Sequence, residues 1–236
     1  MLKNKKNVKE LIYNFSSKFG IGVFRRVFPE YFAKEPLKPT DRYIEYPFVI
    51  RNLPKPPAKV LDVGCSGSCF PLLLTGFGYD VFGVDVREYA IINKMKFSNF
   101  HFIKEDIRKN YFSDNYFDAV IAISTVEHIG LFGRYGMDDD LGGDKQAVAE
   151  MKRIVNQNGV ILLTFPFGKA KILKPYTRVY DSNLVKLLTV GLEIETEEYY
   201  MQDIEENWYQ CHRNEAEAVN ANNERYPLCL IKLRKK

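Results

Sequence analysis

Short apolar runs and amphipathic segments alternate along the chain from residue 59 onwards. Apolar runs of roughly four to eight residues are typical of buried strands, whereas apolar residues that recur every three or four positions are typical of helices. The helical spacing is clearest over residues 145–155, and a glycine at position 159 follows it as a natural stop. The alternation predicts an α/β domain with a mostly parallel sheet and helices on both faces. The predicted strands span residues 59–63, 81–84, 100–104, 117–123, 160–165, 192–200 and 228–233.

The first 57 residues follow a different pattern. Six prolines fall between positions 36 and 57, a density that is typical of a linker. Before them, five apolar residues share one face of an expected amphipathic helix: Val8, Leu11, Ile12, Phe15 and Phe19. We therefore predict an N-terminal helical extension with a linker over residues 1–57 and one main domain over residues 58–236. Three roles stay open for the helix: a lid over a ligand site, a packing helix, or a basic helix in peripheral contact with a membrane.

Charge and composition argue against several function classes. Of the 236 residues, 46% are hydrophobic and 27% are charged, which suits a globular domain with a buried core. The net charge is +4, but residues 1–30 hold seven Lys or Arg against two Glu, so the rest of the chain is slightly acidic. A body without excess positive charge argues against a nucleic-acid partner.

Location and metal content are also constrained by the sequence. No apolar run approaches the roughly 18 residues that span a bilayer, and no secretory signal follows the basic start. The four cysteines lack the spacing of a metal site, and the aspartates around 138–144 are expected to form a solvated loop rather than a metal site. We therefore expect a cytoplasmic protein that holds no metal.

The decisive motif joins the strand at 59–63 to a glycine turn. A strand that runs into such a turn and then a helix brings backbone N–H groups close to a ligand. A dinucleotide site needs G-x-G-x-x-G, but Ser66 and Cys69 stand where two of these glycines would be. The carboxylate of Asp62, two residues before Gly64, would repel a pyrophosphate. It suits instead a ligand with an ammonium and a sulfonium group, and S-adenosylmethionine is such a ligand.

Four landmarks in this order resemble the class I S-adenosylmethionine-dependent methyltransferases. Residues 62–68 resemble their first motif, D-x-G-x-G-x-G, with departures at Ser66 and Ser68. The other three landmarks are Asp85 at the end of the second strand, Asp106 after the third, and the fourth strand at 117–123. The run Val126-Glu127-His128-Ile129 is similar to the type 11 subgroup, which acts on small molecules. The resemblance covers roughly residues 58–200 and implies a Rossmann-like, seven-stranded sheet whose last strand, at 228–233, is antiparallel.

The resemblance also implies roles for individual residues. Asp85 would accept hydrogen bonds from both ribose hydroxyls, and Asp106 would bind the adenine amino group, with the backbone of Ile107 beside it. Ser124 would lie beside the methionine part of S-adenosylmethionine. The complete predicted cofactor-binding set is Asp62, Gly64, Cys65, Gly67, Asp85, Val86, Asp106, Ile107 and Ser124.

Four further residues are candidates for the chemistry at the methyl acceptor. His128 follows the fourth strand at the substrate edge of the sheet, so it is either a general base or a helix-start residue with no catalytic duty. Glu127, Arg178 and Tyr180 are candidate acceptor-binding residues.

Together, these motifs predict a methyltransferase that moves a methyl group from S-adenosylmethionine to an oxygen of a small-molecule or glycan acceptor. The alternatives are an RNA- or protein-directed methyltransferase and a non-catalytic domain that binds S-adenosylmethionine. The N/D-P-P-Y/F tetrapeptide of amino-methylating nucleic-acid enzymes is missing, because residues 124–127 read Ser-Thr-Val-Glu. The presence of Asp62, Asp85 and Asp106 argues against a domain that has lost the ability to bind its ligand.

Overall fold

The computed structural model divides the chain into two units, Met1–Lys38 and Pro39–Lys236. It describes residues 40–89, 98–131, 140–174 and 177–235, together with residues 23, 26 and 27. The helix expected over residues 8–19, most of the helix expected over 88–95 and the start of the acidic loop lie outside the described residues. The boundary between the units falls after residue 38, whereas the proline pattern places it after residue 57.

An eight-stranded sheet forms the centre of the second unit, with the strand order β3-β2-β1-β4-β5-β10-β8-β9. The first five strands in this order are parallel, and β10 runs antiparallel to both of its neighbours. The strands are β1 (Lys59–Val63), β2 (Asp80–Asp85), β3 (Phe100–Lys104), β4 (Phe117–Ile123), β5 (Val155–Pro166), β8 (Leu192–Gln202), β9 (Trp208–Cys211) and β10 (Leu228–Lys235). The predicted Rossmann-like α/β fold is confirmed, and the strand beyond the expected seven is β9, a short edge strand paired with β8.

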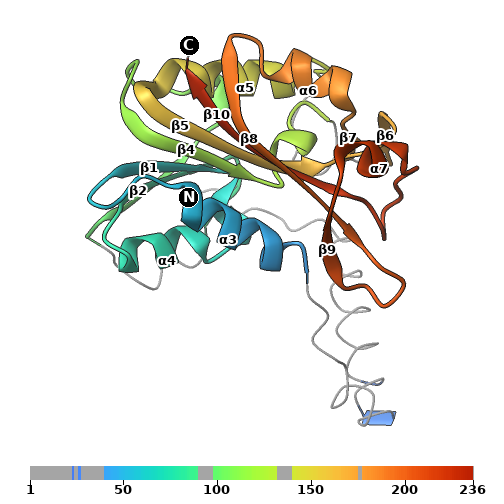
Figure 1. Cartoon of the computed structure of the whole chain (residues 1–236). Coiled ribbons are helices and arrows are strands. Elements are labelled where there is room, and N and C mark those ends of the chain that lie inside the picture. Colours follow the sequence, from blue (N-terminus) through green and yellow to red (C-terminus); the bar gives the residue numbers. More distant parts are fainter. Residues whose placement is uncertain are drawn as a thin grey trace. The chain divides into compact units, whose positions relative to one another are not determined.

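Helices cover both faces of this sheet, as Figure 1 shows for α5 and α6 on one face and α3 and α4 on the other. The described helices are α3 (Arg42–Asn52), α4 (Phe70–Gly76), α5 (Gly143–Ile154), α6 (Ser182–Leu188) and α7 (Arg213–Ala218). Short 3₁₀ turns follow three strands: η1 (Cys65–Gly67), η3 (Ile107–Lys109) and η4 (Val126–His128). A small second sheet pairs β6 (Lys171–Leu173) with β7 (Thr177–Val179).

The core has one apolar layer on each side of the sheet. Along β4, Val120 and Ala122 face the layer that contains α5 and α6, whereas Ala119 and Ile121 face the layer that contains α3 and α4. All four side chains are fully buried. Burial on both faces explains why β4 is a continuous apolar run rather than an alternating one.

Helix α3 lies in the segment that the prolines suggest is a linker. It begins after Asp41, whose carboxylate accepts a hydrogen bond from the backbone N–H of Arg42 at 3.0 Å. Pro47 lies inside this helix, where it removes one backbone donor. Phe48 and Val49 are fully buried against the sheet, and this burial offsets the lost hydrogen bond. The segment is therefore part of the main domain.

Candidate active site

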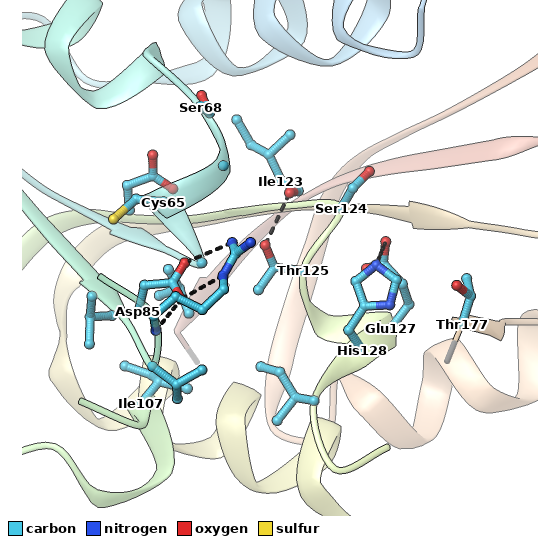
Figure 2. A pocket seen from close by; sticks show the side chains of 18 of the residues that line it. Cys65, Ser68, Asp85, Ile107, Ile123, Ser124, Thr125, Glu127, His128 and Thr177 are labelled. Carbon is cyan, nitrogen blue, oxygen red and sulfur yellow. Dashed lines mark hydrogen bonds and ion pairs between the residues drawn. The ribbon is translucent and has the colours of Figure 1, made fainter. Parts of the chain in front are cut away.

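A cavity of about 650 Å³ lies at the carboxyl ends of β1, β2 and β4. Parallel strands place their ligand sites at this edge of the sheet. All nine residues of the predicted cofactor-binding set line the cavity, as do Glu127 and His128 (Figure 2). Segments far apart in the sequence therefore meet here in the way the motif order predicts.

The turn after β1 depends on a residue without a side chain. Gly64 has a φ of +81°, a left-handed conformation that favours glycine. A Cβ atom at this position would lie 2.5 Å from both Cγ2 and Oγ1 of Thr125. The backbone N–H of Gly64 donates to the carbonyl of Val84 at 2.8 Å, and the Tyr89 hydroxyl donates to the carbonyl of Ser68 at 2.6 Å. The turn is therefore held against β2 and closely approached by the loop after β4.

Asp85 ends β2 with its carboxylate at the cavity wall. One oxygen accepts from the backbone N–H of Ser66 at 2.9 Å, and the other accepts from the backbone N–H of Arg87 at 2.8 Å. The Arg87 guanidinium lies 3.2 Å from each oxygen. The carboxylate is thus fixed in orientation, and ribose hydroxyls that bind it would share it with Arg87.

Asp106 has a similar neighbour two residues on. Its carboxylate caps η3 by accepting from the backbone N–H of Arg108 at 3.0 Å, and it forms an ion pair with the Arg108 guanidinium at 2.7 Å. Arg108 also reaches Asp140 at 3.2 Å, which ties the start of η3 to the loop before α5. Asp106 lines the cavity, and its contact with adenine stays a prediction.

Asp62 is only 4% exposed. Burial raises the pKa of its carboxyl to about 8, although the positive charge of Arg42 lowers it and the charge of Asp85 raises it further. A bound cation would favour the charged form of this carboxyl. Asp62 therefore has the chemistry expected of a wall residue beside an ammonium or sulfonium group.

Helix α3 contributes a cavity-lining arginine and a buried acid paired with it, and the sequence patterns single out neither. Glu45 is fully buried and accepts hydrogen bonds from Ser124 Oγ at 2.6 Å and Thr164 Oγ1 at 2.5 Å. Arg42, which lines the cavity, forms an ion pair with Glu45. Burial raises the pKa of Glu45, and the charge of Arg42 opposes this shift. Glu45 stands three positions before Phe48 and four before Val49, so the three residues share one face of the helix. An acidic residue on an apolar helix face is the sequence signal that could have located the contacts of Glu45.

Glu127 and His128 lie on η4, directly after β4. Glu127 is 2% exposed, and burial raises the pKa of its carboxyl to about 8. Its Oε1 atom lies 3.7 Å from Nε2 of His128. Its Oε2 atom has no hydrogen-bond partner among the described residues. The pair therefore combines an imidazole at the cavity with a buried carboxyl that still has one oxygen to satisfy.

Arg178 and Tyr180 do not line the cavity, contrary to the acceptor-binding role expected for them. Both are buried, at 6% and 1% exposed. Arg178 donates to the carbonyl of Ile129 at 2.6 Å, and the Tyr180 hydroxyl donates to Asp144 at 3.0 Å. Their polar groups bind the loop after η4 and the start of α5.

A further part of the cavity wall comes from residues for which the sequence patterns predict no role. It mixes two tyrosines, small polar groups and apolar groups: Tyr46, Ile129, Pro166, Leu173, Thr177, Asn223 and Tyr226. Asp41, the capping residue of α3, lies beside them and accepts from the Tyr226 hydroxyl at 3.1 Å. No cluster of three or more potential metal ligands occurs in the described part of the chain.

Residues 61–163 match the family model described as a methyltransferase domain. No curated protein matches the chain. Among the helices of the described ranges, none is long and apolar enough to cross a bilayer.

Solved structures share the fold at low sequence identity. A protein from Pyrococcus horikoshii is 22% identical, with a TM-score of 0.56, over 90% of this chain and 98% of its own. The N-methyltransferase NodS from Bradyrhizobium japonicum, solved with S-adenosylhomocysteine, is 14% identical, with a TM-score of 0.59, over 85% and 89%. The 1,6-didemethyltoxoflavin-N1-methyltransferase from Burkholderia thailandensis is 12% identical, with a TM-score of 0.55, over 100% and 93%.

Proposed function

We propose that this chain, a class I S-adenosylmethionine-dependent methyltransferase, transfers the methyl group to a hydroxyl oxygen of a small-molecule or glycan acceptor. The observation that supports this acceptor chemistry is the Glu127–His128 pair, which lines the same cavity as the predicted cofactor-binding residues. An imidazole has a pKa near neutrality and is the side chain best suited to take a proton from a hydroxyl.

The residues of the cavity fit S-adenosylmethionine. Gly64, Cys65 and Gly67 form the turn at the cavity wall, and the glycine at position 64 lets the loop after β4 approach this turn closely, because a Cβ atom there would meet Thr125. Asp85 offers a fixed carboxylate to the ribose, and buried Asp62 offers a carboxyl to the positively charged methionine part. When bound, S-adenosylmethionine supplies a methyl group that is activated by a sulfonium charge.

The chain's own contribution is alignment, exclusion of water and proton removal. His128 takes the proton of the acceptor hydroxyl, so that the oxygen becomes the better nucleophile. Glu127 positions the imidazole through the 3.7 Å approach of Oε1 to Nε2 and favours the imidazolium that results. Both side chains are largely buried, with His128 at 12% and Glu127 at 2%, which strengthens this interaction relative to water.

The test begins with the cofactor. Titration of the protein with S-adenosylhomocysteine and with NADH by calorimetry should give a Kd of about 1–100 µM for the former and no binding for NADH. Tight binding of NADH alone would overturn the assignment.

The acceptor atom is then tested with tyramine, a probe that carries both a phenolic hydroxyl and an amine. Transfer from S-adenosylmethionine with a ¹³C-labelled methyl group should place the label on the oxygen, and label on nitrogen alone would contradict the proposal. The variant His128→Asn should lower turnover about 10²–10⁴-fold. Its affinity for S-adenosylhomocysteine should match that of the wild type, because the cofactor residues are untouched.

A further inference from the structure

We propose that the methyl acceptor carries an ammonium group, and that Glu127 binds it through the Oε2 atom that has no partner among the described residues. This inference rests on the proposed function, because it concerns the acceptor of the same site. The Oε1 atom of Glu127 lies beside His128 and positions this base, and the Oε2 atom binds the ammonium group of the acceptor. One carboxyl therefore positions both the base and the substrate.

The Oε2 atom of Glu127 is buried and has no hydrogen-bond partner among the described residues. Buried polar atoms are almost always hydrogen-bonded, and an orphaned one needs an explanation. The carboxyl of Glu45 is also fully buried, and it has three partners, Arg42, Ser124 and Thr164, so a buried carboxyl oxygen without a partner is not general in this protein. Glu127 lies at the cavity beside His128 (Figure 2), which makes a bound molecule the natural partner.

The wall of the cavity carries more acidic than basic side chains among the described residues. Six of the described lining residues are acidic, and two are arginines. Arg87 is bound to Asp85, and Arg42 is bound to buried Glu45. Both cations are therefore engaged by carboxylates of the protein. Burial raises the pKa of Asp62 and of Glu127 to about 8, and an ammonium group bound beside Glu127 would favour its charged form. An anionic acceptor would meet two arginines already bound to carboxylates, so the wall favours an ammonium group over an anion.

The cavity wall also has apolar groups that suit the body of the acceptor. Ile129, Pro166, Leu173 and the ring of Tyr226 provide apolar surface beyond Glu127. Pockets of this kind orient a ligand through a few polar groups set in an apolar wall. An acceptor with a small apolar body, an ammonium group at one end and a hydroxyl at the other fits this wall.

Three probes with the same phenol body separate charge from shape. Tyramine carries an ammonium group, tyrosol carries a hydroxyl in its place, and 4-hydroxyphenylacetate carries a carboxylate. Each is titrated by calorimetry into the full chain saturated with S-adenosylhomocysteine. We expect tyramine to bind at least about tenfold more tightly than tyrosol, and 4-hydroxyphenylacetate to bind most weakly.

The variant Glu127→Gln keeps the shape of the side chain and cannot take on the negative charge that a bound ammonium group would favour. It should reduce the preference for tyramine over tyrosol to less than about threefold. Glu105→Gln is the matched control, because Glu105 lines the same cavity beside Asp106 at the expected adenine end, and it should keep the full preference.

Equal affinities of wild-type protein for tyramine and tyrosol would overturn the inference, even if the variant did not fold. So would a full preference that survives in Glu127→Gln, or no binding of any probe up to about 10 mM. These outcomes leave the proposed function standing as long as S-adenosylhomocysteine binds. Failure of S-adenosylhomocysteine to bind would instead refute the function itself.

Discussion

Replacing Gly64 by alanine tests the geometry on which the cofactor site depends. Two costs follow from the structure. The φ of +81° places an alanine in the left-handed region, at about 1–2 kcal/mol. The added methyl group also lies 2.5 Å from Cγ2 and Oγ1 of Thr125, far inside normal contact distance.

Thr125 gives way only at a further cost. Its hydroxyl donates to the carbonyl of Ile123 at 3.0 Å (Figure 2), and rotation of the side chain would break this bond, at about 1 kcal/mol. We therefore expect Gly64→Ala to lower the free energy of unfolding by about 2–4 kcal/mol. For a chain of this length that corresponds to a fall in Tm of about 5–15 °C.

Urea and thermal denaturation followed by circular dichroism measure this loss, and calorimetry with S-adenosylhomocysteine measures the accompanying loss of binding. Gly76→Ala is the control, because a Cβ atom there meets nothing within 4 Å and the residue ends a helix. It should raise stability by about 0.5–1 kcal/mol. The double variant Gly64→Ala, Thr125→Ala should lose less free energy of unfolding than the sum of the losses in the two single variants, because the shorter side chain at position 125 relieves the clash. A Gly64→Ala protein within about 0.5 kcal/mol of wild type would refute the geometry.

Three further predictions follow from individual side chains. Asp85→Ala should weaken S-adenosylhomocysteine at least about tenfold by calorimetry, while Asp80→Ala at the other end of the same strand should change it less than about twofold. Glu127 has a folded-state pKa of about 8 against an ordinary 4.5, so its contribution to stability is complete below about pH 4.5 and is lost as the pH rises through 8. The free energy of unfolding, measured with urea, should therefore fall less between pH 5 and pH 8 for Glu127→Gln than for wild type. Equal falls for the two proteins would contradict the burial of this carboxyl. Arg178→Met should cost about 2–4 kcal/mol in the same assay, because it leaves the carboxylate of Asp144 buried without its cation; a loss below about 0.5 kcal/mol would show that the guanidinium is not needed.

The strands, and the gathering of the proposed cofactor-binding residues around one cavity, could be predicted because their signals are local. The run from Val60 to Gly67 contains a strand and the turn at its carboxyl end, which is the end where parallel strands place their ligand sites. Asp85 and Asp106 then follow at strand ends, which parallel topology brings to one edge. No long-range information is needed to place these groups together.

The acceptor side could not be predicted, because its contacts join distant parts of the chain. Glu45 meets Ser124 and Thr164 across 79 and 119 positions of the sequence. The prolines around α3 suggest a linker, because only two apolar residues, Phe48 and Val49, indicate that one face of this helix is buried. Arg178 is expected at the acceptor because the sequence does not distinguish an arginine that binds backbone carbonyls inside the protein from one that binds a substrate.

The position of β10 sets an order in which the sheet is assembled. Strand β8 is made before β10, yet it joins the sheet only through β10, which lies between it and β5. While residues 167–227 are leaving the ribosome, β5 keeps an open edge, and such edges favour association with other chains. Loss of Leu228–Lys235 would therefore detach β8 and β9 together, although neither of them would have been altered.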